Sequence, residues 1–251
     1  MDVVLNALFL DPSTFIKDAM SGVPNCVPPD NVCGTSNPEI TRMIQSNIKD
    51  VAQKLSIHST ESTIHVSLDE LRESAKSCPV LNSQERFDQK GMNDPSVFIE
   101  YLVGIFPCLK MAGKSPLVYL HAEPLEQING KDLSDVIDTH VETTKKPFDD
   151  PELVIFDITR LERGEYNENV NVFPNEKLDL SGTADTHLPA ELSAVVVWKE
   201  FHYTVYVKVG ESWYYLDDAK PYVEMVGTYE NLLEHKDGFV SKDGKLFFYT
   251  C

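Results

Sequence analysis

The sequence predicts an α+β fold in which a helical lobe precedes an antiparallel sheet. Over the first hundred residues, apolar side chains recur at helical spacing. Beyond them, short runs rich in β-branched and aromatic residues are separated by turn residues, as strands are. The length of 251 residues allows one large domain or two small ones. Because helices and strands segregate along the chain, we expect a helical lobe at 1–112 and a sheet lobe at 113–251.

The helical lobe begins with Val4, Leu5 and Leu8 on one side of a short helix that Asp11-Pro12 ends. A loop rich in Pro, Asn and Cys follows, and Asn37-Pro38 has the form of an N-cap with Pro at the first helical position. Ser67 to Glu70 form a possible capping box, and Asp94-Pro95 opens a further helix. The predicted helices are residues 2–10, 38–55, 67–75 and 95–105, with the loop at 22–36.

The sheet lobe contains one more helix, predicted at 133–141, between two of its strands. The strands are the runs in which Val, Ile, Tyr, Phe and Trp are enriched. They are predicted at 117–120, 153–158, 194–198, 201–209, 213–216 and 246–249.

The charge of the chain limits its partners. Lys and Arg number 22 and Asp and Glu number 40, so the net charge is −18. Such a charge argues against nucleic acid and against anionic membrane surfaces, since both would be repelled. It permits a basic protein partner, although an acidic surface that serves only solubility fits equally well.

The five cysteines are too few and too scattered for a disulfide framework, and no Cys-x-x-Cys pair provides a structural zinc site. The apolar start of the chain lacks a basic region and a cleavage site, so it is not a convincing signal peptide, and no apolar run is long enough to cross a membrane. We therefore expect a reducing compartment, the cytosol or nucleus (or a host cell's interior, if the protein is viral), and not secretion.

The chemistry of the chain is predicted to lie in a hairpin that turns about Gly210-Glu211. In that register Thr204 faces Asp217, and His202 points to the same side as Thr204 because strand side chains alternate. Asp217 then becomes the diagonal neighbour of His202, where a carboxylate can hold an imidazole in one tautomer. A chance acidic neighbour on a half-exposed sheet explains the spacing as well, and a three-residue turn would put the two side chains on opposite faces.

This hairpin resembles the histidine box of the ubiquitin-specific proteases, which are papain-like ubiquitin carboxyl-terminal hydrolases. The family reads roughly Gly-His-Tyr-x-x-Tyr-x-Lys, then Trp-Tyr-x-Phe-Asp-Asp. Here the two parts are His202-Tyr203-Thr204-Val205-Tyr206-Val207-Lys208 and Trp213-Tyr214-Tyr215-Leu216-Asp217-Asp218. Phe201 replaces the usual glycine, and Leu216 replaces the usual phenylalanine.

Weaker blocks follow in the family's order, so the resemblance covers nearly the whole chain. They are Gln89 with Asp94-Pro95-Ser96-Val97-Phe98-Ile99, Leu153 to Arg160, Phe173-Pro174, Leu178 to Ser181, Ala194 to Val197 and Leu246 to Tyr249. The resemblance implies a single catalytic domain over 1–251 with a papain-like cysteine protease fold, in which the helical lobe is thumb-like and the sheet lobe is palm and fingers-like. It implies ubiquitin or ubiquitinated proteins as partners and no cofactor. The fingers of the family often carry a Cys-x-x-Cys zinc pair, and since none is present we expect no metal.

The resemblance also implies roles for individual residues. His202 would be the catalytic base, Asp217 would orient it, and Asp218 would help to polarise a water or oxyanion contact, or else simply end its strand. Asp94, Phe98 and Tyr203 would bind the ubiquitin tail. Asp94 is equally suited to cap a helix, and Tyr203 to pack in the sheet.

The nucleophile box of the family reads Asn-x-x-x-Cys-Tyr-Met/Leu-Asn/Asp-x-x-Leu-x-x-Leu-Phe, and this chain resembles it only from Met1 onward. The catalytic cysteine would lie just before Met1. We expect either a cysteine-type deubiquitinase whose given chain lacks its nucleophile and is inactive, or a pseudoenzyme that binds ubiquitin without cleaving it. Cys26, Cys33, Cys78, Cys108 and Cys251 are all read as structural or incidental.

Overall fold

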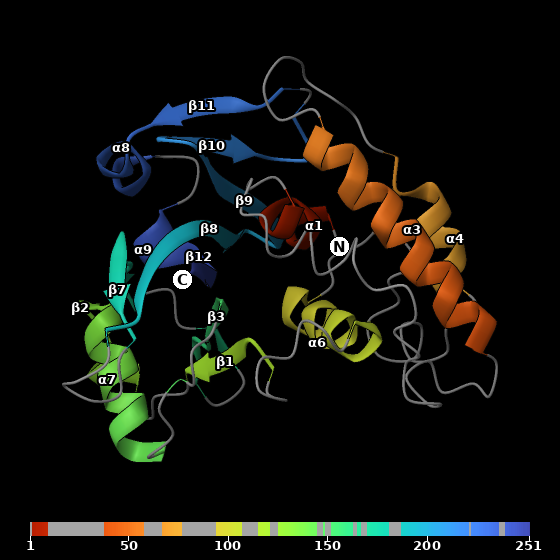
Figure 1. Ribbon diagram of the computed structural model, residues 1–251. Helices are drawn as coiled ribbons and strands as arrows, with labels where there is room; N and C mark the ends of the chain where they lie inside the picture. The colour runs from red at the N-terminus through yellow and green to blue at the C-terminus, as the bar shows by residue number, and fades with distance from the viewer. Residues whose placement is uncertain are drawn as a thin grey trace. The chain divides into compact units, whose positions relative to one another are not determined.

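A computed structural model describes much of the chain and divides it into two compact units, Met1–Ser115 and Pro116–Cys251 (Figure 1). The described residues are 2–9, 38–57, 67–76, 94–106, 115–120, 125–144, 148, 152–162, 165–166, 170–180, 187–220, 222–235 and 239–251. The predicted loop at 22–36 and the cap at Asn37 lie outside them. Within the described residues, no helix is both long enough and apolar enough to cross a membrane.

The first unit is helical, as predicted. Its helices are α1 (Asp2–Phe9), α3 (Pro38–Ile57), α4 (Asp69–Lys76) and α6 (Pro95–Ile105). The apolar stripes that predicted them are buried, for example Leu5 in α1, Ile44 in α3 and Leu102 in α6. Asn47 of α3 donates to the carbonyl of Glu70 and to Ser74 Oγ, so α4 is fixed against α3 by hydrogen bonds as well as by apolar contacts.

The second unit is built on one large sheet with the strand order β1-β3-β12-β8-β9-β10-β11, and β7 pairs with β8 off this path. The strands are β1 (Leu117–Leu120), β3 (Leu153–Ile158), β7 (Lys177–Asp179), β8 (Pro189–Lys199), β9 (His202–Val209), β10 (Ser212–Leu216), β11 (Glu224–Gly227) and β12 (Gly244–Thr250). Smaller elements are η2 (Leu125–Gln127), β2 (Lys131–Asp132) paired with β6 (Val172–Phe173), and β4 (Leu161–Glu162) paired with β5 (Glu165–Tyr166). The helices are α7 (Leu133–Thr144), α8 (Tyr229–Glu234) and α9 (Val240–Asp243). The chain is thus α+β.

The prediction of a wholly antiparallel sheet was wrong at one edge, because β1 pairs with β3 in parallel. Parallel neighbours need a long crossover connection, and the segment that contains α7 provides it. The two strands and the helix between them were predicted from the sequence, whereas η2 and β2 of the crossover were not. Their order, strand then helix then strand, signals a parallel pair, and the prediction did not take it into account.

One face of the sheet forms a continuous apolar core. Alternate residues of the central strands point into it, including Val195 and Val197 of β8 and Tyr206 of β9, together with Trp213 of β10 and Phe247 of β12. Residues of α7, α8 and α9 complete this core: Leu133, Val136, Ile137, Leu232 and Val240. The core fixes which face each side chain of β9 and β10 takes, and therefore fixes the face on which His202 lies.

Arg160 secures the corner where α9 leads into β12. Its side chain is 2% exposed and donates hydrogen bonds to the backbone carbonyls of Val170, Ser241 and Gly244. A buried guanidinium is tolerated when its donors are satisfied, and these carbonyls satisfy three of them. The start of β12, which lies opposite β8, is thereby fixed in place.

Candidate active site

The β9–β10 hairpin has the register that the sequence predicts. Val209 pairs with Ser212 and Val205 with Leu216, so the turn is Gly210-Glu211. Gly210 has a φ of +60°, a value that suits glycine in a two-residue hairpin loop. Extending the ladder by one pair places Thr204 opposite Asp217, and His202 therefore shares a face with Asp217.

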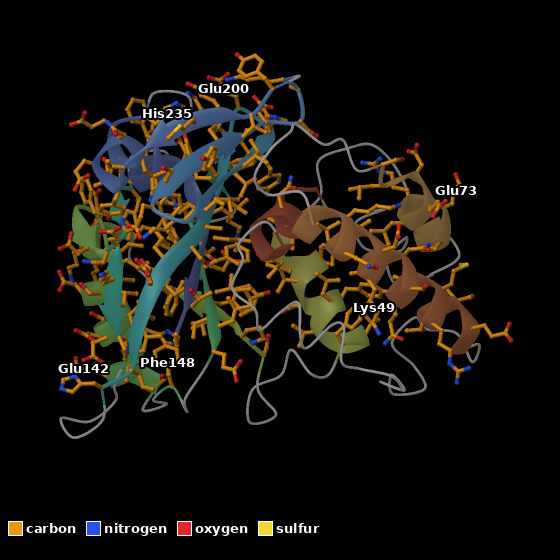
Figure 2. The ribbon with its side chains drawn as sticks, turned by 45° about the horizontal axis from the view of Figure 1, so that its top comes forward. Lys49, Glu73, Glu142, Phe148, Glu200 and His235 are labelled. Carbon is orange, nitrogen blue, oxygen red and sulfur yellow. The ribbon has the colours of Figure 1, made fainter. Side chains whose placement is uncertain are left out.

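His202 begins β9 directly after a two-residue turn. Lys199 of β8 pairs with His202, and the turn between them consists of Glu200 and Phe201, with φ values of 50° and 63° (Figure 2). Two positive φ values are what such a tight hairpin requires, and Asn-Gly is the usual solution. A bulky side chain in this region of backbone angles is strained, and Phe201 is such a residue. Phe201 is 77% exposed, and its ring meets Trp198 edge-on at 6.1 Å between centroids.

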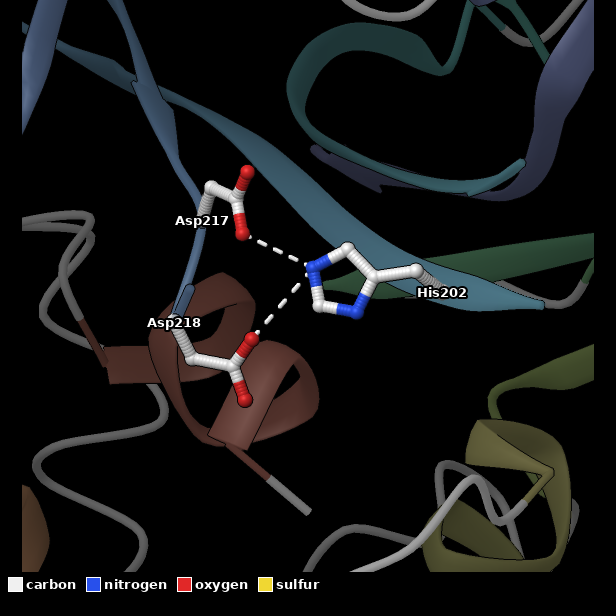
Figure 3. Close-up of side chains that lie close together, drawn as sticks. All are labelled: His202, Asp217 and Asp218. Carbon is white, nitrogen blue, oxygen red and sulfur yellow. Dashed lines mark hydrogen bonds and ion pairs between the residues drawn. The ribbon is translucent and has the colours of Figure 1, made fainter. Parts of the chain in front are cut away.

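Asp217 and Asp218 both approach the same nitrogen of His202 (Figure 3). The distance from His202 Nε2 to Asp217 Oδ1 is 2.7 Å, and that to Asp218 Oδ1 is 3.4 Å. Asp217 is the more buried carboxylate, with 11% of its side chain exposed, whereas Asp218 is 60% exposed. The backbone N–H of Ala219 donates to Asp217 Oδ1 at 2.9 Å and holds that oxygen in position.

The hydrogen bond to Asp217 determines the tautomer of the His202 ring. An ionised carboxylate can only accept, so Nε2 carries the ring proton and donates it. In a neutral imidazole, Nδ1 is then left with a lone pair. This lone pair can take a proton from a nucleophile, and Asp217 can stabilise the imidazolium that results.

The same contacts affect the ionisation of Asp217. Partial burial acts to raise the pKa of its carboxyl, but the hydrogen bonds from His202 and the Ala219 amide, together with the positive charges of His202 and Lys220, outweigh burial. The pKa of Asp217 therefore lies below its usual range, and this carboxylate is ionised at neutral pH.

Tyr203, Asp94 and Phe98 were also predicted as site residues. Tyr203 is half-buried and pairs with Trp198, so it points to the opposite face of β9 from His202. Asp94 and Phe98 belong to the first unit. Asp94 caps α6 by accepting from the Ser96 amide at 2.9 Å, the structural role that its sequence context also predicted. Phe98 is buried, with 1% of its side chain exposed.

Cys251 is the one cysteine within the described part of the chain, and it lies far from His202. It follows Thr250, which pairs with Glu191 of β8, whereas His202 pairs with Lys199 at the other end of the same strand. Eight residues of strand separate Glu191 from Lys199, a length of about 26 Å. Cys251 therefore cannot serve His202 as a nucleophile. Cys26, Cys33, Cys78 and Cys108 lie outside the described residues.

Sequence reasoning missed a second histidine cluster. His235 Nδ1 lies 2.7 Å from the Tyr206 hydroxyl, and His235 Nε2 lies 3.3 Å from Glu224 Oε1. These residues come from the end of α8, from β9 and from β11, so no local spacing reveals them. His187 lies 2.8 Å from Asp179, and its side chain is 84% exposed.

Comparison with known proteins adds little to this geometry. No family model matches the sequence, and no curated protein sequence is similar to it. Sixty chains of solved structures match, and one of them is described as an essential yeast splicing factor. It is 12% identical with a TM-score of 0.49, and the match covers 81% of this chain and 59% of that one. At these values the likeness carries no argument about function.

Proposed function

We propose that this chain carries the acid–base half of a thiol hydrolase that cleaves after the C-terminal glycine of ubiquitin, in a papain-like fold. The observation that supports the proposal is the 2.7 Å contact between His202 Nε2 and Asp217, which leaves the lone pair of Nδ1 for a thiol. The likeness of the segment from His202 to Asp218 to the histidine box supports the ubiquitin-specific class. A reducing compartment, the cytosol or the nucleus, suits such a thiol enzyme.

In the proposed mechanism, His202 Nδ1 takes the proton of the attacking thiol. The thiolate forms a bond to the carbonyl carbon of the C-terminal glycine, and the C–N bond to the substrate lysine breaks. The imidazolium returns its proton to the departing amine, and water then hydrolyses the thioester with His202 again as the base. Asp217 holds the ring orientation and stabilises the imidazolium, while Asp218 adds negative charge beside it.

By the resemblance, the cysteine and the tyrosine of the nucleophile box would be the two residues before Met1. Ubiquitin binding without cleavage is the second candidate function, and it applies if no thiol reaches Nδ1 of His202. Cys251 does not reach it, because it lies about 26 Å along the sheet from the base. The net charge of −18 suits either function, since ubiquitin presents arginines around its tail.

A turnover assay tests the hydrolase. The chain extended upstream by its native residues is expected to release fluorophore from a ubiquitin C-terminal amide, whereas residues 1–251 alone are not. In the extended protein, His202→Ala should lower kcat by about a thousandfold or more, and Asp217→Asn should also lower it strongly. His187→Ala is the matched control, because it removes an exposed histidine that also contacts a carboxylate and should leave kcat unchanged.

Two results would contradict this proposal. Full turnover in His202→Ala would exclude His202 as the base. An upstream sequence without cysteine would exclude cleavage by this mechanism. Titration of ubiquitin into residues 1–251 would then decide the second function, and absence of binding at several hundred micromolar ubiquitin would reject it.

A further inference from the structure

We propose that His202, Asp217 and Asp218 form a site for a divalent zinc-like metal ion, and that metal binding there switches off the base. The metal site stands on its own geometry, whereas the switching role rests on the proposed function. The cluster was predicted as a catalytic dyad with an extra acid, and the expectation of no metal considered only cysteine pairs. The structure brings two carboxylates, those of Asp217 and Asp218, to one nitrogen of the His202 ring (Figure 3).

The ligand atoms lie close enough together for a small ion to contact all three after small side-chain shifts. One atom from each of the three residues lies within 4.8 Å of the other two. Zinc binds imidazole nitrogen and carboxylate oxygen at about 2.0–2.2 Å, which sets tetrahedral ligand atoms about 3.3–3.5 Å apart. Asp218 Oδ1 already lies 3.4 Å from His202 Nε2, and Asp217 Oδ1, at 2.7 Å, would have to move away by about half an ångström. Water would complete the coordination.

The surplus of acceptors around Nε2 is what points to a cation. A neutral imidazole has one N–H at this nitrogen, and Asp217 receives it, so Asp218 has no proton of its own to accept at 3.4 Å. A divalent ion would contact all three groups and neutralise both carboxylates. The Ala219 amide already holds Asp217 Oδ1, as outer partners of metal ligands do.

The donor set also indicates the class of metal. Imidazole nitrogen with two carboxylate oxygens suits zinc and its first-row neighbours, whereas magnesium and calcium prefer oxygen alone. With 42% of His202 and 60% of Asp218 exposed, an ion could reach the site and leave it again. We therefore expect reversible binding, as a regulatory site requires, and choose Zn²⁺ as the probe.

Metal binding would reverse the tautomer of His202. An ion on Nε2 needs the lone pair of that nitrogen, so the ring proton transfers through solvent from Nε2 to Nδ1, and the neutral ring stays neutral. Nδ1 then presents an N–H where the free site presents a lone pair. A ring in this state cannot take a proton from a thiol, so the metal removes the base without any change in the fold.

The test is a titration of residues 1–251 with ZnCl₂, followed by calorimetry and by NMR of the histidine ring nitrogens. We expect the His202 signals to change from Nε2-protonated to Nδ1-protonated as zinc is added. The affinity at this site should fall about tenfold or more in Asp218→Asn and in His202→Ala. His187→Ala is the matched control and should leave the affinity unchanged, because the His187–Asp179 pair has only one carboxylate within the described residues.

Unchanged His202 signals at millimolar zinc would overturn the site. Equal affinity in Asp218→Asn would overturn the three-ligand arrangement, and Asp218 is exposed enough for this variant to fold normally. The proposed function fails separately. If zinc binds His202 but the upstream-extended protein does not cleave ubiquitin, the metal site stands and the hydrolase does not. If that protein cleaves ubiquitin with zinc bound to His202, the switching role is overturned.

Discussion

His202 pairs directly with Lys199 across a two-residue turn, so Glu200 and Phe201 alone connect β8 to β9. The base of the candidate site is therefore fixed by a hairpin tip whose two residues both have unfavourable backbone angles. Strain of this kind clusters at functional sites, where the surrounding structure compensates for it.

The Phe201→Gly variant of the protein should be more stable than the Phe201→Ala variant. Phe201→Gly and Phe201→Ala both lose the ring contact with Trp198, but only alanine keeps a Cβ at a φ of 63°. We expect the glycine variant to exceed the alanine variant by about 1 kcal/mol in the free energy of unfolding by urea. Glu211, which has no positive φ, is the control: there alanine should be the more stable variant. The same order at both positions would contradict the strain at Phe201.

The stability of the protein should depend on Asp217 in acid. Because the folded pKa of Asp217 lies below its ordinary value of 3.8, the ionised carboxylate stabilises the folded state at higher pH. That stabilisation is lost as the pH falls from about 3.8 through the lower folded pKa. Between pH 6 and pH 2.5, the free energy of unfolding by urea should therefore fall less in Asp217→Asn than in the wild type.

His202→Ala serves as the second arm of this experiment. It removes the hydrogen bond and the charge from His202 that lower the pKa of Asp217, and it leaves the bond from the Ala219 amide. The decrease in unfolding free energy at low pH should be intermediate in this variant, smaller than in the wild type and larger than in Asp217→Asn. An equal decrease in all three proteins would mean that His202 and Asp217 do not pair in solution.

Removal of the Tyr206 hydroxyl should destabilise the second unit. Glu224 accepts from His235 Nε2, so His235 Nδ1 must accept from the Tyr206 hydroxyl, which lies 2.7 Å away. Tyr206→Phe leaves this nitrogen without that donor and should cost about 1–2 kcal/mol of unfolding free energy. Tyr214→Phe on the neighbouring strand is the control and should change stability by less than about 0.5 kcal/mol. If the two variants are equally stable, the Tyr206–His235 bond contributes nothing.

Alkaline unfolding should reveal the environment of Tyr229. Burial, together with the negative charges of Glu176, Asp132 and Glu230, raises the pKa of Tyr229 from 10.0 to about 12. The unfolded state therefore loses this proton first, and stability falls as the pH rises from about 10 to 12. Denaturant unfolding of Tyr229→Phe across this range should show a shallower decline than the wild type. Some decline should remain, since burial also raises the pKa of Tyr249. If the unfolding free energies of Tyr229→Phe and the wild type decline equally with pH, the pKa of Tyr229 is not raised.

Much of the fold follows from local patterns. The apolar spacing after Pro38 and the cap at Asp94 predict helices that the structure contains, because each pattern is resolved within one element. The hairpin register is local in the same way. Gly210 fixes the turn, strand alternation fixes the faces, and together they bring His202 and Asp217 together across 15 residues.

Tertiary structure alone decided the rest, because the contacts involved join distant segments. The order of strand, helix and strand indicates a parallel pair, but only the tertiary structure shows that β1 lies beside β3 at the edge of the sheet. Arg160 meets carbonyls more than 80 residues away, and His235 meets Tyr206 across 29 residues. Tertiary structure also brings Asp217 and Asp218 to the same nitrogen of His202. Within a strand, adjacent side chains point to opposite faces. Because β10 ends at Leu216, the two aspartates are free of this alternation, and both carboxylates reach His202.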